Sequence, residues 1–155
     1  MFEEGVQGTN DMKKGVLFVC IGNSCRSIIA EALTEHYWAQ VIHACSAGTY
    51  PLGHITPHTL EVLRERHIPT DRLYSKGFSA IAFHQIQHIV SLTGDLLEHL
   101  LPPSFSGEII RRVVHDPYGE DLNVFRRTLD TIDRLVRDEL PEWLHLHAGK
   151  ISLPG

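Results

Sequence analysis

The chain has no long apolar run, no excess of basic residues and only three cysteines among its 155 residues. Without about 20 consecutive apolar residues, no segment predicts a transmembrane helix. The polar, acidic stretch from Met1 to Met12 also lacks the apolar core of a signal peptide. The formal net charge of −5 argues against a general nucleic-acid-binding protein. We therefore expect neither a membrane nor a nucleic acid as a partner.

The scarcity of cysteine limits the chemistry in a second way. An odd number of cysteines does not suit a disulfide scaffold, and Cys20 and Cys25 lie close together where a reactive thiol fits better. This usage favours a reducing, cytoplasmic environment. Among the histidines, His84 and His88 could share a helix face, but no carboxylate or cysteine joins them at ligand spacing. We expect no metal and no other cofactor.

The length and the 43% hydrophobic content suit one compact α/β domain with a full core. No internal repeat or linker divides the chain. We expect a flexible N-terminal tail over residues 1–13, one domain over residues 14–144, and a loose, histidine-rich C-terminal tail over residues 145–155.

Strand and helix patterns alternate along this domain. Short apolar runs predict strands at 15–20, 41–45, 89–92 and 112–115. Helical periodicity predicts helices at 27–38, at 57–66 with Thr56 as the cap, and from 122 until Pro141 closes the helix. Strands that alternate with helices imply right-handed crossovers and a parallel sheet, which binds its ligand at the carboxyl ends of the strands.

The residues that follow the first strand carry the strongest chemical signal. Cys20 ends the strand, a short loop with Gly22 and Asn23 follows, and Arg26 opens a helix. The backbone N–H groups of such a loop and of a helix start converge on one anion. Arg26 adds a planar, two-pronged charge that matches phosphate oxygens. The same positive field favours the thiolate of Cys20, which is the nucleophilic form.

Every residue of this loop after Cys20 is expected to help bind phosphate. These residues are Ile21, Gly22, Asn23, Ser24, Cys25, Arg26 and Ser27. Ser27 could also donate a hydrogen bond to the Cys20 sulfur and help it leave. If Cys20 were merely a small buried residue at the end of a strand, this set of neighbours would have no explanation.

The run from Cys20 to Ser27 resembles the signature loop of the low-molecular-weight protein tyrosine phosphatase family, which includes bacterial arginine phosphatases and thioredoxin-coupled arsenate reductases. The runs 46–49 and 116–118 resemble two further landmarks of that family, in the same order. The resemblance extends roughly from residue 14 to residue 140. It implies a four-stranded parallel sheet with helices on both faces. Relatives usually carry proline where this chain has Ile28, a loss that removes rigidity but no catalytic group.

Asp116 is expected to supply the second half of the chemistry. It follows an apolar strand, and Pro117 holds the chain extended before it turns. Asp-Pro alone is an ordinary turn signal. The resemblance implies instead that Asp116 protonates the leaving group and then, as a base, activates water against a phosphocysteine. Cys20, Arg26 and Asp116 are thus the expected catalytic residues.

Four residues bear on the choice of substrate. Tyr50 and Tyr118 are the expected walls of the substrate slot. Glycine at position 119 is similar to the pattern of the arginine-phosphatase branch, whereas eukaryotic relatives carry a second aromatic residue at this position. Ser24 points the same way, since tyrosine-specific relatives usually hold a bulkier aliphatic residue at this position and arginine-specific ones hold threonine. A small hydroxyl could leave room for a guanidinium group, although Ser24 is equally readable as a neutral loop substitution.

Arsenate reductase is the main alternative, because the run from Ser91 to Asp95 resembles the redox segment of those enzymes. They carry a cysteine where this chain has Thr93 and a second one several residues later, where Leu100 and its neighbours offer no thiol. The disulfide cascade that resets such an enzyme therefore lacks its cysteine pair. Cys45 lies in a different strand and is expected to be a buried core residue.

Cys25 leaves a redox role open. A reversible disulfide between Cys25 and Cys20 would protect the nucleophile from deeper oxidation and could support weak, glutaredoxin-type reduction. Cys25 could equally be a packing residue. Relatives often hold the loop asparagine with a histidine where this chain has Leu73, so we expect Asn23 to find another partner, in Ser46 or Arg72.

We expect Lys76, Arg111 and Arg112 to belong to the solvated surface. Together these patterns predict a cysteine phosphatase that acts on phosphotyrosine or phosphoarginine in proteins and binds inorganic phosphate or similar oxyanions at its loop. A non-catalytic phosphate-binding module is a weaker alternative, because the full catalytic set is present. Neither the natural substrate nor the oligomeric state follows from the sequence.

Overall fold

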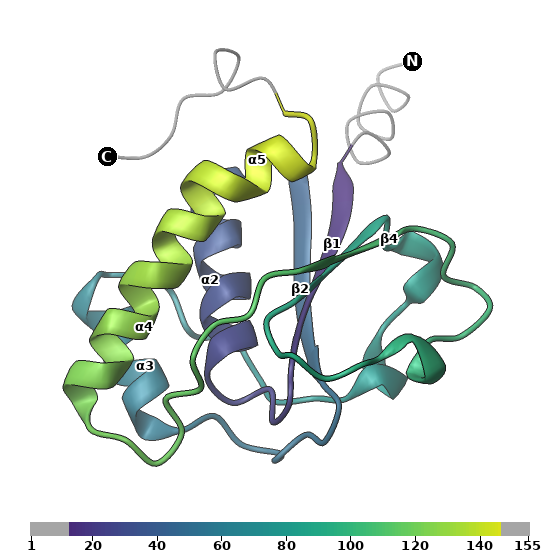
Figure 1. Cartoon of the computed structure of the whole chain (residues 1–155). Coiled ribbons are helices and arrows are strands. Elements are labelled where there is room, and N and C mark those ends of the chain that lie inside the picture. The colour runs from purple at the N-terminus through teal and green to yellow at the C-terminus, as the bar shows by residue number, and fades with distance from the viewer. Residues whose placement is uncertain (1–12, 147–155) are drawn as a thin grey trace.

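Four parallel strands form the centre of the structure, a computed structural model that describes residues 13–146 (Figure 1). They are β1 (Lys14–Cys20), β2 (Ile42–Gly48), β3 (His88–Ser91) and β4 (Glu108–Arg111), in the order β2-β1-β3-β4. The expected four-stranded parallel sheet is confirmed. Apart from residues 13, 145 and 146, the two predicted tails lie outside the described residues.

Strand β1 lies between two neighbours, and this explains its continuous apolar run. Val16 and Phe18 belong to the core on one face of the sheet, and Leu17 and Val19 belong to the core on the other. A strand covered on both faces needs no alternation of polar and apolar residues. The strand ends at Cys20, which therefore lies at the carboxyl edge of the sheet.

The α-helices cover one face of the sheet (Figure 1). They are α2 (Arg26–Trp38), α3 (Pro57–Glu65) and α4 (Leu122–Arg134). The indole N–H of Trp38 donates to the carbonyl of Val136 at 2.9 Å and joins α2 to the turn that follows α4. Ile28 is fully buried in this core.

Three short 3₁₀ helices cover the other face. They span Phe78–Ala80, Phe83–Gln85 and Glu98–Leu100. A second, smaller core lies beneath them, with Phe83, Ile86 and Leu97 packed against the sheet. Helices therefore lie on both faces, as expected, but they are of different kinds. Among residues 13–146, no helix has the length and apolar character needed to cross a membrane.

The predicted strands at 41–45 and 112–115 have wrong boundaries. β2 runs on to Gly48, so the residues expected to follow the strand belong to it. β4 lies four residues earlier, at Glu108–Arg111. It is an edge strand with exposed ends, and its charged ends hide it from a search for apolar runs. Beyond it, Val114 still donates to the carbonyl of Leu92 at 3.0 Å, so the chain remains extended.

The prediction that Pro141 closes the last helix is also wrong. After α4 the chain widens into a π-helical turn at Leu135–Glu139 and continues as α5 (Leu140–Trp143). Pro141 lies in the first turn of α5, where its missing N–H is tolerated. The wider turn thus lets a helical segment pass through a proline.

Candidate active site

The loop between β1 and α2 directs its carbonyl groups away from its centre. The carbonyls of Cys20, Ile21 and Gly22 accept hydrogen bonds of 2.8–3.1 Å from N–H groups of the segment 49–52. The carbonyl of Ser24 accepts from a threonine hydroxyl of α3 at 2.8 Å. In a trans peptide the carbonyl and the following N–H point in opposite directions, so the loop N–H groups turn inward.

These inward N–H groups have no protein acceptor. Within residues 13–146, no atom accepts a hydrogen bond from the backbone N–H groups of residues 21–25. The first turn of α2 adds further free donors, since Cys25 precedes the helix without a capping side chain. Buried donors without acceptors are rare in folded proteins. The loop is therefore a concave site that is suited to an anion.

Asn23 links the loop to the segment around Lys76 and orients the hydroxyl of Ser27. The backbone N–H of Lys76 donates to the Oδ1 of Asn23 at 2.8 Å. That bond leaves the Nδ2 of Asn23 to donate to the Oγ of Ser27 at 2.7 Å. Since this Oγ already accepts, its own O–H is free to donate to the Sγ of Cys20, which lies 2.9 Å away.

The expected partners of Asn23, Ser46 and Arg72, are therefore wrong. Asn23 has a φ of 48°, a left-handed conformation that needs support from its surroundings, and the support comes from Lys76 and Ser27. Ser46 instead donates to the carboxylate of Glu31 at 2.6 Å. A backbone N–H can serve as the partner whatever its side chain, so the sequence carries no signal for it.

Lys76 corrects another prediction. Its side chain is only 9% exposed, and its Nζ lies 3.6 Å from the Oε1 of Glu31 in α2. It is not a solvated surface lysine. Arg111 and Arg112 are partly exposed, and they form ion pairs with Glu98 and Glu139 respectively.

Arg26 is almost fully buried and is held by backbone oxygens. Its Nη1 donates to the carbonyls of Leu92 at 3.2 Å and Val114 at 3.0 Å. Its Nη2 lies 3.5 Å from the Oδ2 of Asp116. Its Nε is buried and has no partner among the described residues. An unpaired buried donor at this position further indicates that the site binds an anion.

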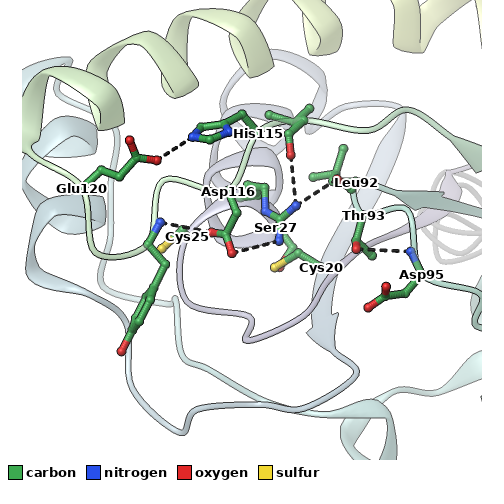
Figure 2. A network of polar contacts seen from close by, with 12 residues as sticks. Cys20, Cys25, Ser27, Leu92, Thr93, Asp95, His115, Asp116 and Glu120 are labelled. Carbon is green, nitrogen blue, oxygen red and sulfur yellow. Dashed lines mark hydrogen bonds and ion pairs between the residues drawn. The ribbon is translucent and has the colours of Figure 1, made fainter.

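Asp116 reaches the site because the chain beyond β4 stays extended along the sheet edge. Its side chain is 47% exposed, and its Oδ1 accepts from the backbone N–H of Tyr118 at 3.1 Å. Figure 2 shows Asp116 beside Cys20 and Cys25. The carboxylate is thus anchored by one oxygen while it remains accessible from solvent.

One cavity of about 210 Å³ brings the predicted residues together. It is lined by Cys20, Ile21, Gly22, Ser24, Cys25, Arg26, Tyr50, Leu52, Asp116 and Tyr118. The tyrosines are strongly exposed, at 77% for Tyr50 and 55% for Tyr118, so they lie at the rim. Asn23 and Ser27 do not line the cavity but support it from behind. Leu52 is an apolar wall residue that no sequence pattern indicated.

The side chain of Ser24 forms a hydrogen bond with the residue before α3. It is 2% exposed, and its Oγ accepts from the backbone N–H of Thr56 at 3.0 Å. Its O–H remains available to a group in the cavity. Thr56 precedes α3 as expected but does not cap it through its hydroxyl, which pairs with the hydroxyl of Thr59 at 2.8 Å.

The described residues hold two further thiols, those of Cys25 and Cys45. Cys25 is buried in the cavity wall, and its Sγ lies 3.5 Å from the Oγ1 of Thr56. Burial raises the pKa of the Cys25 thiol. Cys45 is half-buried rather than fully buried, and burial raises its pKa to about 12. Cys45 is therefore a protonated, unreactive thiol at neutral pH.

The segment that resembles a redox motif carries no thiol. Thr93 is buried, and its Oγ1 accepts from the backbone N–H of Asp95 at 3.3 Å (Figure 2). Leu100 lies partly exposed in a 3₁₀ helix. The hydroxyl of Thr93 thus stabilises this turn.

A larger cavity of about 530 Å³ lies beside α2 and β2, between Glu35, His43 and Arg72. Its lining has no thiol and no free helix start, so size does not identify the reactive site. In the part of the chain that the structure describes, no three histidine, cysteine or acidic side chains gather as metal ligands.

Comparisons with known proteins agree with this geometry. Residues 15–145 match the family described as low molecular weight phosphotyrosine protein phosphatase. A protein-arginine-phosphatase of Bacillus subtilis is 30% identical over 137 residues, which cover 79% of this chain and 91% of that protein. An arsenate reductase of Staphylococcus xylosus is 30% identical over 122 residues, which cover 77% of this chain and 91% of that protein.

A solved structure gives the same result for the fold. It is described as an arsenate reductase in the phosphate binding state, and it superposes with a TM-score of 0.72 at 26% identity, covering 83% of this chain and 98% of that one. Relatives with both activities are thus similarly close. The family match spans the loop, both core layers and Asp116, and the chain belongs to the low-molecular-weight phosphotyrosine protein phosphatase family.

Proposed function

We propose that this protein is a phosphatase that removes phosphate from protein side chains through a phosphocysteine intermediate. The observation that carries the proposal is the loop itself. Its carbonyls are bonded outward, its N–H groups have no acceptor among the described residues, and the Cys20 sulfur lies beside Ser27 at its base. A phosphate dianion would satisfy the free donors and place phosphorus next to the nucleophile.

In the first step the Cys20 thiolate attacks phosphorus, and the bond from phosphorus to the leaving group breaks. Asp116 delivers its proton to the departing oxygen or nitrogen. Arg26 and the loop N–H groups hold the non-bridging oxygens, where charge accumulates in the transition state. The orphaned Nε of Arg26 is a donor for one of these oxygens.

In the second step water attacks phosphorus, and Asp116, now a carboxylate, takes a proton from that water. The bond between sulfur and phosphorus breaks, and the thiolate leaves. Ser27 can stabilise this thiolate, because its O–H is the one left free by Asn23. The products are inorganic phosphate and the dephosphorylated side chain.

For the substrate we propose phosphoarginine or phosphotyrosine. The exposed rings of Tyr50 and Tyr118 at the rim suit a flat leaving group of either kind. Ser24 favours phosphoarginine, since its small side chain leaves space at the cavity wall. The relative named as a protein-arginine-phosphatase supports the same choice.

Arsenate reductase is the second candidate, and the similarity to arsenate reductases favours it. The reduction of arsenate to arsenite takes two electrons, which two thiols supply when they join as a disulfide. The only thiol beside Cys20 in the cavity lining is that of Cys25. Reduction would therefore need Cys25 together with an external thiol such as glutathione.

Parallel assays of the purified protein on phosphotyrosine, phosphoarginine and arsenate test the proposal. We expect hydrolysis of at least one phosphorylated side chain and no useful arsenate turnover with thioredoxin. Robust thioredoxin-dependent consumption of NADPH would overturn it. If glutathione and glutaredoxin support reduction, Cys25→Ser should abolish that activity and spare the phosphatase.

A further inference from the structure

We propose that Glu31 and Lys76 are positioning residues for the nucleophile, and that their largely buried ion pair holds the segment Ser75–Gly77 against the phosphate loop. This inference rests on the proposed phosphatase function and deepens it. The segment, called here the buttress, lies far from the loop in sequence and carries no side chain that lines the active-site cavity.

The buttress contacts the loop and β2 through its backbone and one hydroxyl. The Oγ of Ser75 donates to the carbonyl of Gly22 at 3.2 Å, and the N–H of Lys76 donates to Asn23. In the opposite direction, the N–H of Gly48 donates to the carbonyl of Lys76 at 2.9 Å. The main chain of residue 76 thus connects Asn23 in the loop with Gly48 at the end of β2.

The side chain of Lys76 determines where that main chain lies. Its Nζ contacts Glu31 at 3.6 Å and the carbonyl of Tyr74 at 3.1 Å, and it also lies 4.4 Å from the centre of the Tyr74 ring. Glu31 is 14% exposed and is fixed in turn by Ser46. The pair therefore connects α2, β2 and the buttress at one point.

Burial makes this connection costly to break. Burial raises the pKa of Glu31, while the hydrogen bond from Ser46 and the charge of Lys76 oppose the shift. Removal of one partner from a buried ion pair leaves the other charge uncompensated. The buttress would then move until water reaches the remaining charge.

The consequence reaches Cys20 through three hydrogen bonds in series, from Lys76 to Asn23, from Asn23 to Ser27 and from Ser27 to the sulfur. Any residue other than proline at position 76 keeps its N–H, but only a correctly placed N–H holds the left-handed Asn23. If that bond weakens, the amide of Asn23 no longer occupies Ser27. The Ser27 hydroxyl can then turn away from the sulfur, and the thiolate loses a charge-assisted hydrogen bond.

A double-mutant cycle on the full chain tests this inference. We expect Lys76→Met and Glu31→Gln each to lower kcat for p-nitrophenyl phosphate by about tenfold, the scale of a lost hydrogen bond to a charged group. KM should change much less, because the loop N–H groups remain. The double variant should lose no more than either single variant, since both act through one contact. Lys76→Arg should restore most of kcat.

The control pair is Arg66 and Asp130, an exposed ion pair between the end of α3 and α4. Arg66→Met and Asp130→Asn should leave kcat within about twofold, because exposed pairs contribute little. If the Lys76 and Glu31 variants lose unfolding free energy but keep wild-type kcat, the ion pair is merely structural and the inference fails. Should Lys76→Met not fold, Glu31→Gln, which removes the partner charge from the same contact, is compared with Lys76→Arg in folded protein.

A second readout does not depend on turnover. The rate at which iodoacetamide alkylates Cys20, measured by mass spectrometry with and without inorganic phosphate, should fall about tenfold in Lys76→Met. If the wild-type protein hydrolyses no phosphate ester, the proposed function fails while this rate still tests the positioning role. An unchanged rate in Lys76→Met would overturn the positioning role even if the phosphatase activity is present.

Discussion

The Nη2 of Arg26 lies 3.5 Å from the Oδ2 of Asp116, although one side chain is 5% exposed and the other 47%. The cation therefore forms part of the floor of the cavity, and the carboxylate reaches it from the mouth. A substrate phosphate bound on this floor would contact the guanidinium, and its leaving group would point back toward the carboxylate at the mouth. This placement suits the proposed role of Asp116 as the acid that protonates the leaving group.

The first prediction concerns the nucleophile. Cys20→Ser should lose nearly all turnover, because a hydroxyl is a far weaker nucleophile than a thiolate at neutral pH. It should still bind vanadate or phosphate through Arg26 and the loop N–H groups, measured by calorimetry. Arg26→Lys should also be severely impaired, since a point charge cannot replace the planar fork. Substantial turnover by Cys20→Ser would rule out the phosphocysteine.

The second prediction concerns the proton donor. Asp116→Asn removes the acid, so it should slow hydrolysis most where the leaving group is most basic. We expect a loss of about 10²–10⁴-fold for phosphotyrosine and a much smaller loss for p-nitrophenyl phosphate. Steady-state kinetics on both esters gives the comparison. Equal losses on the two substrates would show that Asp116 does not transfer the proton.

The third prediction addresses substrate choice. Ser24→Ile adds bulk to the cavity wall and removes the acceptor for the N–H of Thr56. We expect the ratio of kcat/KM for phosphotyrosine to that for phosphoarginine to rise. Ser24→Thr is the control, because it keeps a hydroxyl oxygen that can accept from the N–H of Thr56. An unchanged ratio would make Ser24 a neutral residue and return the question to Tyr50 and Tyr118.

The fourth prediction concerns the packing of β2 against the loop. A Cβ on Gly48 would lie 2.5 Å from the carbonyl oxygen of Ile21 and 2.8 Å from the backbone nitrogen of Asn23. Gly48→Ala should therefore displace the loop, cost about 1–3 kcal/mol of unfolding free energy, and lower kcat by up to about 10²-fold. Gly94→Ala is the matched control, because a Cβ there meets nothing within 4 Å. Wild-type kcat in Gly48→Ala would show that the loop tolerates displacement.

The fifth prediction concerns pH and stability. Burial lowers the pKa of His88 below its ordinary 6.5, although Glu108 opposes the shift. The unfolded chain therefore takes up a proton at a higher pH than the folded protein. His88 stabilises the fold above about pH 6.5, and this contribution is lost as the pH falls below that value.

Urea unfolding of the wild type and of His88→Gln between pH 5 and pH 8 measures this effect. The unfolding free energy of the wild type should fall more steeply below about pH 6.5 than that of the variant. Parallel curves would show that His88 titrates alike in both states.

The sequence predicted the elements around the site better than those at the sheet edges. Cys20 follows a strand buried on both faces, and such a strand is a continuous apolar run that is easily found. The edge strand β4 carries Glu108 and Arg111 at its ends, so no comparable run marks it. The next four residues hold a similar apolar pair, Val113 and Val114, and the sequence does not show which of the two pairs lies in the strand.

The supports of the site were harder to predict than its reactive groups. A nucleophile and a cation must be particular residue types, and Cys20 and Arg26 are therefore visible in the sequence. The carbonyls of Leu92 and Val114 that hold Arg26 belong to the backbone, which any residue supplies. Lys76 resembled an ordinary surface lysine, because only the fold brings it to Glu31.

The position of β1 between β2 and β3 has a consequence for local opening. Its N–H groups are enclosed by a neighbour on each side and a core on each face. Such groups exchange with deuterated water only when the whole domain unfolds, whereas exposed edges open more readily. We expect the amides of Val16 to Val19 to show the slowest hydrogen exchange in the chain. The thiol of Cys20 would then be attached to the part of the protein that opens least.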